Sequence, residues 1–189
     1  MALFRTVGPE AEPVTLADAK AHLRLDHDGE DGLIEGLIRA AREEVEASCG
    51  LALIAQDWRL TLDRVPRSGT VAIRRHPVVE ILSVTVYGAD GEASLLQPQG
   101  LALDRASRPA RLHFADVPQP RIAMNGIEID FRAGFGEAGT DVPDLLKRAM
   151  LALVAHWFEF RATFGAESQP VSYPAGYDRL IAPWRPGRL

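Results

Sequence analysis

The spacing of apolar residues predicts two helices at the start of the chain. After Asp31 apolar side chains recur every three or four residues, which is typical of one face of an α-helix of about four turns. They are Leu33, Ile34, Leu37, Ile38, Ala41 and Val45. Gly50 follows, and glycine often ends a helix because it adopts the left-handed conformation without a Cβ clash. A shorter helix is predicted after Thr15 and up to about Arg24, because Thr15 and Asp18 have the spacing of a capping box.

Between residues 57 and 134 the period of the apolar positions changes to two, which predicts short β-strands. Trp58, Leu60 and Leu62 alternate with polar neighbours, and "EILSVTVYGADGE" reads as a strand that enters a turn at Asp90-Gly91. The other candidate strands lie at Val71–Ile73, Leu101–Leu103, Arg111–Phe114 and Ile127–Phe131. About six short strands with turns rich in proline and glycine favour an antiparallel sandwich or barrel.

Helical spacing returns after Pro143, a residue that suits the first turn of a helix. One apolar stripe consists of Leu146, Met150, Leu153, Trp157, Phe160 and Phe164. A second set, Leu145, Leu151, Val154 and Phe158, covers much of the remaining surface. A helix that is apolar on nearly all sides is buried on more than one of them, which points to a partner subunit.

The last residues of the chain differ again in composition. Prolines and glycines exclude a long helix there, yet the segment is too apolar for a solvated linker. Its aromatic and arginine side chains are the types that dominate binding hot spots, and proline stiffness reduces the entropy lost on docking. We therefore expect this tail to reach another protein; the alternative is that it packs against its own β-domain.

These patterns predict an α+β fold with four parts. Residues 1–56 form an N-terminal arm and two helices, and residues 57–134 form an antiparallel β-domain. Residues 135–166 form a long helix, and residues 167–189 form an extended tail.

Composition and charge exclude several classes of protein. The net charge is −5, and residues 1–56 hold eleven acidic against five basic side chains, so no basic face suits duplex binding. Cys49 is the single cysteine, which excludes an intrachain disulfide and a cysteine-based zinc site. The first residues lack the apolar stretch of a signal peptide, and the longest apolar run, Ala149–Ala155, is too short to span a bilayer. We expect no membrane association.

A glycine motif, Gly134-Phe-Gly-Glu-Ala-Gly139, follows the last predicted strand and has the G-x-G-x-x-G spacing of a dinucleotide-binding turn. Its context does not fit, because the helix begins later and carries Asp141 and Asp144 where a pyrophosphate would lie. No second parallel strand is available. We interpret the motif as a glycine-rich exit from a strand.

The remaining candidate sites are weak as well. His156 and Glu159 are one helical turn apart but lack a second pair of metal ligands, and the acidic stretch from Asp26 to Asp31 lacks EF-hand spacing. Arg74-Arg75-His76 is best explained as a solvated basic loop, and Cys49 as a small core residue. We predict that the protein is not an enzyme and holds no cofactor or metal.

The stretch "VTLADAKAHLRLDHDGEDGLIEGLIRAAREEVEASCGLALIAQDWRLTLD" resembles the opening of phage head–tail connector (adaptor) proteins of long-tailed phages, which also occur in gene transfer agents. The later stretches "RHPVVEILSVTVYGADG", "IEIDFRAGFG", "VPDLLKRAMLALVAHWFEFR" and "YDRLIAPWRPGRL" match in the same order. The resemblance therefore covers nearly the whole chain, although it does not distinguish a phage from a gene transfer agent.

The resemblance implies a small helical core, completed by residues 135–166, with the β-domain inserted between the second and third helices. It also implies a homo-oligomeric ring, usually twelvefold, that is made in the bacterial cytoplasm and sits at the head–tail junction of the particle. The ring would join the portal protein to a stopper or tail-terminator protein, and DNA would pass through it without sequence-specific binding. By this analogy the portal contacts are Tyr173, Tyr177, Leu180, Ile181, Trp184 and Arg185. The candidates for subunit packing are Trp157, Phe160, Arg161 and Phe164.

Two further hypotheses follow from charge and fold. Glu35, Glu43 and Glu46 would form an acidic helix face that lets DNA slide if it lines the bore. The rival function is a β-domain that binds a small ligand or sugar on a helical scaffold, which predicts a stable monomer with a preformed pocket and a dispensable tail.

Overall fold

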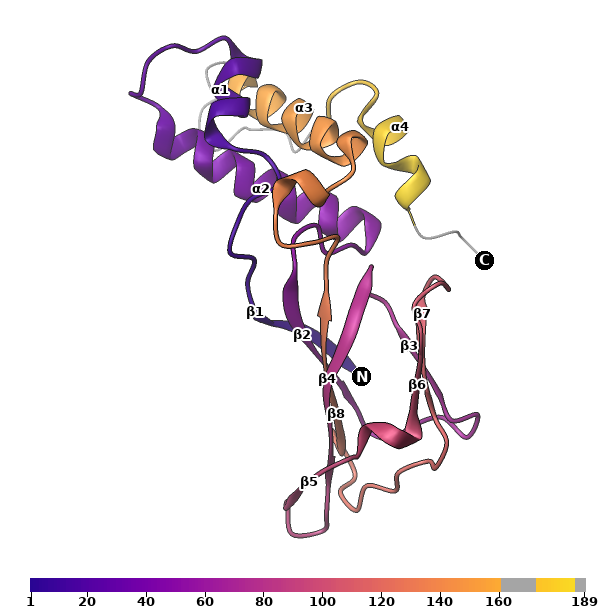
Figure 1. Cartoon of the computed structure of the whole chain (residues 1–189). Coiled ribbons are helices and arrows are strands. Elements are labelled where there is room, and N and C mark those ends of the chain that lie inside the picture. The colour runs from indigo at the N-terminus through magenta and orange to yellow at the C-terminus, as the bar shows by residue number, and fades with distance from the viewer. Residues whose placement is uncertain (161–172, 186–189) are drawn as a thin grey trace. The chain divides into compact units, whose positions relative to one another are not determined.

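The computed structural model describes residues 1–160 and 173–185, and the chain divides into two compact units (Figure 1). The β unit consists of Met1–Pro9 and Ala55–Phe135, and the helical unit consists of Glu10–Ile54 and Gly136–Leu189. The fold is α+β, as predicted, with the strands of residues 56–133 inserted between the second and third helices. The structure assigns the first nine residues to the β unit, whereas the sequence pattern grouped them with the helices.

The helical unit begins with α1 (Leu16–Leu23) and α2 (Asp31–Cys49). The capping box before α1 is present: Thr15 Oγ1 accepts a hydrogen bond from the Asp18 N–H at 3.1 Å, and the Thr15 N–H donates to Asp18 Oδ2 at 3.2 Å. Arg24 ends α1 in the left-handed conformation with φ of 58°, and Gly50 ends α2 with φ of 67°. The local signals in the sequence therefore placed both helices correctly.

The core of the helical unit lies where α2 meets α3 (Asp144–Phe160). Each helix contributes five buried apolar side chains to it: Ile34, Ile38, Ala41, Val45 and Cys49 from α2, and Leu146, Ala149, Met150, Leu153 and Val154 from α3. The second apolar set of α3 is less covered, since Leu145 is 48% exposed. Leu151 and Phe158 are half-buried.

The tail contains a short helix, α4 (Tyr177–Ile181), which contacts α3 and is followed by a 3₁₀ turn at Ala182–Trp184. A turn at Pro174–Tyr177 precedes α4, and Gly176 occupies the left-handed region within it at φ of 87°. Pro183 limits the helix to little more than one turn. The tail therefore contains a helix that its content of proline and glycine did not predict.

The β unit contains two antiparallel sheets. The five-stranded sheet has the order β1-β2-β8-β4-β5, and the three-stranded sheet has the order β3-β7-β6. The strands are β1 (Ala2–Val7), β2 (Gln56–Leu62), β3 (Thr70–Ile73), β4 (Val78–Tyr87), β5 (Ala93–Leu95), β6 (Leu101–Asp104), β7 (Ala110–Phe114) and β8 (Ile127–Ala133). The prediction of an antiparallel β-domain is confirmed, and β1 and β5 are the two strands that the pattern missed.

The apolar positions of the strands form the core between the two sheets. Ile127, Ile129 and Phe131 of β8 are fully buried, and they alternate with Glu128, Asp130 and Arg132 on the outer face. The same alternation occurs in β7, whose Leu112 and Phe114 are buried. Period-two patterning in the sequence thus identified the core face of this unit.

Candidate assembly surfaces

A buried ion network fixes the polar side of α2. The Arg42 guanidinium is 3% exposed and contacts Glu12 at 2.9 Å and Glu46 at 3.1 Å. Glu46 also accepts a hydrogen bond from the Leu53 N–H at 2.8 Å. Burial disfavours the charge on Arg42, but the carboxylates of Glu46 and Glu12 outweigh it and raise the pKa of Arg42.

This network corrects the prediction of an acidic face made of three residues. Glu35 and Glu43 are exposed, but Glu46 is buried at 4% exposure and already paired with Arg42. Glu35 and Glu46 are three helical turns apart and point in nearly the same direction. They differ because Glu12 and the segment at Leu53 cover the Glu46 end of the helix. The exposed acidic face is therefore limited to Glu35 and Glu43.

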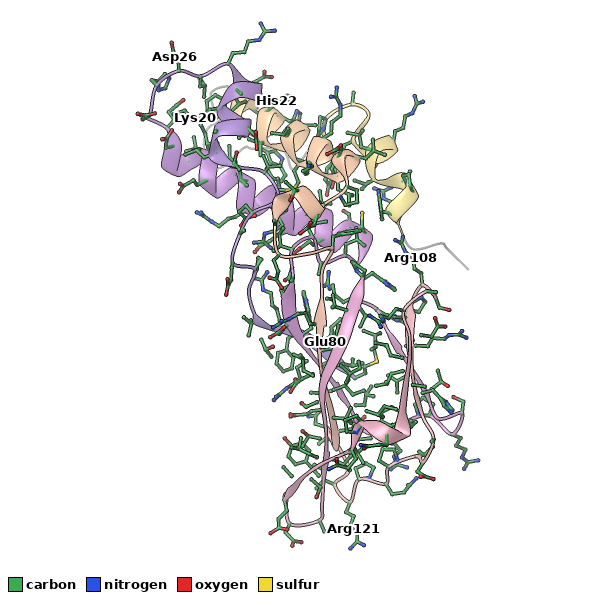
Figure 2. The ribbon with its side chains drawn as sticks, in the orientation of Figure 1. Lys20, His22, Asp26, Glu80, Arg108 and Arg121 are labelled. Carbon is green, nitrogen blue, oxygen red and sulfur yellow. The ribbon has the colours of Figure 1, made fainter. Side chains whose placement is uncertain are left out.

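Lys20 neutralises part of the negative charge of the acidic loop between α1 and α2. Lys20 Nζ lies 2.6 Å from Asp28 Oδ1 and 2.8 Å from Asp31 Oδ1 (Figure 2 labels Lys20 at the base of this loop). These contacts raise the pKa of Lys20, and the Lys20 ammonium lowers the pKa of Asp28. Across residues 1–160 and 173–185, no group of three or more ligand side chains has the geometry to hold a metal ion.

The structure separates the predicted portal contacts into buried and accessible residues. Tyr177 and Ile181 are buried in the helical unit at 1% and 0% exposure, so they anchor the tail to its own chain. Tyr173 stacks on Tyr177 with ring centroids 5.2 Å apart, and its hydroxyl donates to Glu44 at 3.0 Å, which raises the pKa of Tyr173. The tail thus packs on its own helical unit rather than only extending outward.

The remaining tail candidates stay accessible. Leu180 and Trp184 are half-buried, and Arg185 is exposed. Arg185 pairs with Asp178 at 2.5 Å, and the two side chains are 45% and 74% exposed. Such an exposed pair is weak, so Arg185 can exchange Asp178 for a partner's carboxylate at little cost.

The candidates for subunit packing lie at the end of α3, beyond its buried stretch. Trp157 and Phe160 are half-buried, and the Phe160 ring lies 4.4 Å from that of His156. Arg161 and Phe164 lie outside the described residues. Val154 is the last fully buried residue of α3, and the aromatic side chains beyond it keep part of their surface exposed.

The glycine motif serves packing within the helical unit. A Cβ at Gly136 would collide with the carboxylate of Asp141, and a Cβ at Gly139 would lie 2.7 Å from the Pro13 carbonyl oxygen. The Asp141 carboxylate also accepts a hydrogen bond from the Ala138 N–H at 3.0 Å. The close approach of neighbouring atoms explains why glycine is required at two of the three positions of the motif. This explanation does not involve a bound nucleotide.

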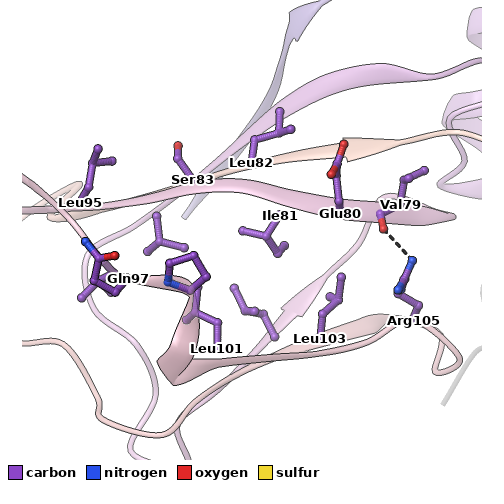
Figure 3. Close-up of a pocket in the computed structure, with 14 residues that line it drawn as sticks. Val79, Glu80, Ile81, Leu82, Ser83, Leu95, Gln97, Leu101, Leu103 and Arg105 are labelled. Atoms are coloured by element: carbon purple, nitrogen blue, oxygen red, sulfur yellow. Dashed lines mark hydrogen bonds between the residues drawn. The ribbon is translucent and has the colours of Figure 1, made fainter.

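The β unit carries a groove that no sequence signal predicted, and we call it the β4 groove. Its volume is about 440 Å³, and it lies between the sheets at β4, β6 and β7 and the segment 95–98 (Figure 3). The lining is mainly aliphatic, with Ile81, Leu101, Leu103 and Leu112 among its residues. Among the described residues, the lining has no aromatic ring and few polar groups, which makes it a poor match to a sugar. The position of the groove depends on where the two sheets separate. The local pattern of apolar residues does not encode this separation.

Comparison with known proteins finds a family that this chain resembles over part of its length. Residues 13–87, which span α1, α2 and the first strands of the inserted sheets, match the model of the phage gp6-like head-tail connector protein family. The predicted resemblance to head–tail connector proteins is therefore confirmed. No curated protein matches the sequence significantly.

Three of the solved structures that resemble this chain come from gene transfer agent particles. A chain in the neck of an empty particle, computed with C6 symmetry, matches with a TM-score of 0.84 and 26% identity over 100% of this chain and 97% of that chain. A chain in the virion of a native particle gives the same values. A chain in the native neck, computed with C12 symmetry, matches over the same shares of both chains with 26% identity and a TM-score of 0.80.

The matched family is one of head–tail connectors, and the matched chains come from the necks and a virion of gene transfer agent particles. Among the described residues no helix is long and apolar enough to cross a membrane.

Proposed function

We propose that this protein is a head–tail adaptor, which forms a ring of twelve copies between the portal and the tail-side proteins of a phage or gene transfer agent particle. The observation that carries this proposal is the match of the entire chain, both units included, to a chain in the neck of gene transfer agent particles. The twelvefold ring is supported by the C12 symmetry of one matched neck. A stopper or tail-terminator protein would bind the opposite side.

The accessible part of the tail is the portal contact in this proposal. Tyr177 and Ile181 hold α4 on the helical unit, and Leu180, Trp184 and Arg185 remain for the partner. Tryptophan and arginine contribute strongly to binding when a partner covers them. Tyr173, at 47% exposure, lies beside this surface.

The ring would let DNA pass without holding it. Glu35 and Glu43 are exposed carboxylates on α2 and would repel phosphates if this face lines the bore. The double substitution Glu35→Lys and Glu43→Lys should then slow DNA release from assembled particles, most strongly at low salt. Unchanged release would show that this face points away from DNA.

Subunit packing within the ring is assigned to the aromatic end of α3, where Trp157 and Phe160 are half-buried. Neighbours in a ring meet through two different surfaces of the same chain, so one helix can face its own core and the next copy. A Trp157→Ala variant should weaken ring formation on the portal more than it weakens folding.

The test of the proposal is binding to the purified cognate portal ring, followed by size-exclusion chromatography with light scattering. Removing the tail would also remove Tyr177 and Ile181 from the core, so point variants are the cleaner probe. We expect the wild-type chain to migrate with the portal as a ring-sized complex and Arg185→Glu to bind at least tenfold more weakly. Arg121→Glu, an exposed charge reversal in the β unit, is the matched control and should bind normally.

If the wild-type chain does not bind the portal, the proposed function is wrong. If Arg185→Glu binds as tightly as the wild type, the adaptor function stands and the portal contact lies elsewhere.

A further inference from the structure

Most of the exposed large apolar side chains of the β unit lie at the two opposite edges of its larger sheet, and Met124 is an exception. At one edge, β1 exposes Phe4 at 46% and Val7 at 52%. At the other edge, the mouth of the β4 groove exposes Val79 at 38%, Leu82 at 44% and Leu95 at 68%. Apolar residues concentrated at specific edges, rather than scattered, mark interaction surfaces.

The backbone at the β4 groove is open to another strand. β4 pairs with β8 from Val78 to Val86, but β5 pairs with β4 only at Thr85–Tyr87. Among the described residues, β6 pairs with β7 alone, so its other edge also faces no strand. The groove therefore lies between two strand edges, one from each sheet.

Two hydrogen bonds mark the ends of the open stretch of β4. Arg105 Nη1 donates to the Val79 carbonyl at 2.9 Å, as Figure 3 shows, and the Leu96 N–H donates to the Val84 carbonyl at 2.9 Å. Between these two bonds, β8 is the one strand that pairs with β4 among the described residues. In Figure 3, Ile81 points toward β6, whereas Glu80, Leu82 and Ser83 point to the other face of β4.

β1 has the properties of the strand that would fill this opening. Five of its six residues are exposed, and β2 is its one strand partner among the described residues. An apolar edge strand of this kind promotes pairing with another chain unless something covers it. Arg5 is its single charged side chain, and the lining of the groove holds one charge of each sign, Glu80 and Arg105.

We propose that β1 of one copy pairs with the open edge of β4 in the next copy, so that the five-stranded sheets continue around the ring. This inference rests on the proposed ring function and names the contact between neighbouring β units. The partner is a second copy of this chain, and pairing by strand addition supplies main-chain hydrogen bonds together with side-chain contacts on both faces.

Strand direction supports this pairing. β1, β2, β8 and β4 are successive antiparallel neighbours, so β1 and β4 run in opposite directions. When copies are related by rotation about an axis roughly along the strands, the incoming β1 runs antiparallel to β4, which is the more stable form of pairing. The same contact repeated head-to-tail closes a ring.

The faces of the strands match as well. Leu3 lies opposite Leu60 and therefore shares the core face of the sheet, on which Ile81 lies opposite Phe131. In a continued sheet, Leu3 would extend this apolar row into the β4 groove. Phe4, which lies opposite Arg59 on the outer face, would lie on the face of Leu82.

The size of the contact explains why it would form in a ring. A six-residue strand covers much less than the ~1,600 Å² of a standard stable interface. We therefore expect weak association of the free chains and strong association once the portal holds neighbouring copies together.

The test is cross-linking between engineered cysteines with a flexible bis-maleimide, whose reach tolerates a shift of one residue in register. A chain with both Phe4→Cys and Leu82→Cys is treated as the concentrated free protein and together with the cognate portal. We expect a ladder of dimers, trimers and higher multimers from the double variant. An equimolar mixture of the two single variants should give dimers alone, because each chain then has one reactive edge.

Matched controls exclude nonspecific reaction. The wild-type chain contains buried Cys49 and should give no multimers. A chain with Phe4→Cys and Met124→Cys should also give none, because Met124 is 73% exposed in the same unit but lies outside both edges. Dimers from Phe4→Cys alone would indicate a symmetric pairing of two β1 strands and would overturn the proposal.

The two proposals fail in different ways. Portal binding by the wild-type chain without a ladder under either condition leaves the adaptor function standing and overturns the strand pairing. A ladder in the free protein without any portal binding supports the strand pairing and overturns the adaptor function.

Discussion

The two units of the molecule place their charged groups differently. The helical unit contains seventeen acidic and ten basic residues, and it buries Arg42 among carboxylates. The β unit contains nine acidic and eleven basic residues and keeps its main ion pairs on the outer face of its larger sheet. There Arg59 contacts Asp130 at 2.7 Å and Glu128 at 3.0 Å, with 34% of the arginine side chain exposed.

This difference indicates what each charge contributes. Arg42 cannot exchange its carboxylates for water, so the loss of either side leaves an unpaired charge in the interior. Arg59 and its partners remain close to solvent, which weakens their attraction and lets water replace a lost partner. We therefore expect the helical unit to depend on a few charged residues and the β unit to depend mainly on its apolar core.

The largest effect is expected for Arg42→Ala in the helical unit. The substitution leaves Glu46 buried without its cation, and we expect a loss of about 3–5 kcal/mol in the free energy of unfolding. Denaturant unfolding followed by circular dichroism measures it. Arg39→Ala, an exposed change on the same helix, should cost less than about 0.5 kcal/mol. Equal losses for the two variants would show that the buried network is not needed for stability.

The second-largest effect on stability is expected when the contact of the tail with its own helical unit is weakened. Ile181→Ala removes a fully buried side chain from α4, which should cost about 2–4 kcal/mol and release the tail from α3. Hydrogen exchange should then increase in residues 177–184 more than in α2. Leu180→Ala, at the half-buried neighbouring position, provides the comparison and should have a smaller effect. Unchanged protection of residues 177–184 would mean that α4 does not depend on this contact.

A smaller effect is expected for Arg59→Ala in the β unit. Because the pair is partly solvent-exposed, we expect a loss of about 1 kcal/mol, well below that for Arg42→Ala. The same unfolding measurement compares the two substitutions directly. A loss as large as that of Arg42→Ala would remove the distinction between the two units.

The smallest effect is a pH dependence that comes from Asp130. Its hydrogen bond with Arg59 lowers the pKa of Asp130 below the usual 3.8. A lowered carboxyl pKa contributes stability above the unfolded value, and that contribution disappears as the pH falls from about 4 through the folded-state value. Asp130→Asn should therefore flatten the decline of stability below pH 4, whereas Asp116→Asn, an exposed control, should not. An identical decline in the wild type and Asp130→Asn would contradict this origin.

Local signals in the sequence predicted much of the fold but little of the surface. Thr15, Asp18 and Gly50 act through their immediate neighbours, so the bounds of α1 and α2 could be inferred from spacing alone. β1 was missed because its partner, β2, lies some fifty residues away and Ala2–Val7 has no regular alternation. The groove was missed for the same kind of reason, since it depends on how two sheets separate.

For the candidate sites, too, local sequence signals did not show which side chains distant segments would bury. Helical spacing grouped Glu46 with Glu35, but Glu12 and Leu53 determine that Glu46 is buried. The composition of the tail predicted that it contacts a protein surface. It did not distinguish Tyr177 and Ile181, which pack on their own chain, from Arg185, which stays accessible. Residue type predicted that these segments make contacts, and three-dimensional packing decided with which surface.

The chain passes between the two units three times, after Pro9, after Ile54 and after Phe135. An exchange of the inserted segment between related genes would therefore transfer seven of the eight strands and leave β1 with the recipient. The hybrid sheet would pair its own β2 with a foreign edge strand. A chimera designed to change the β unit must therefore carry residues 2–7 along with residues 55–135.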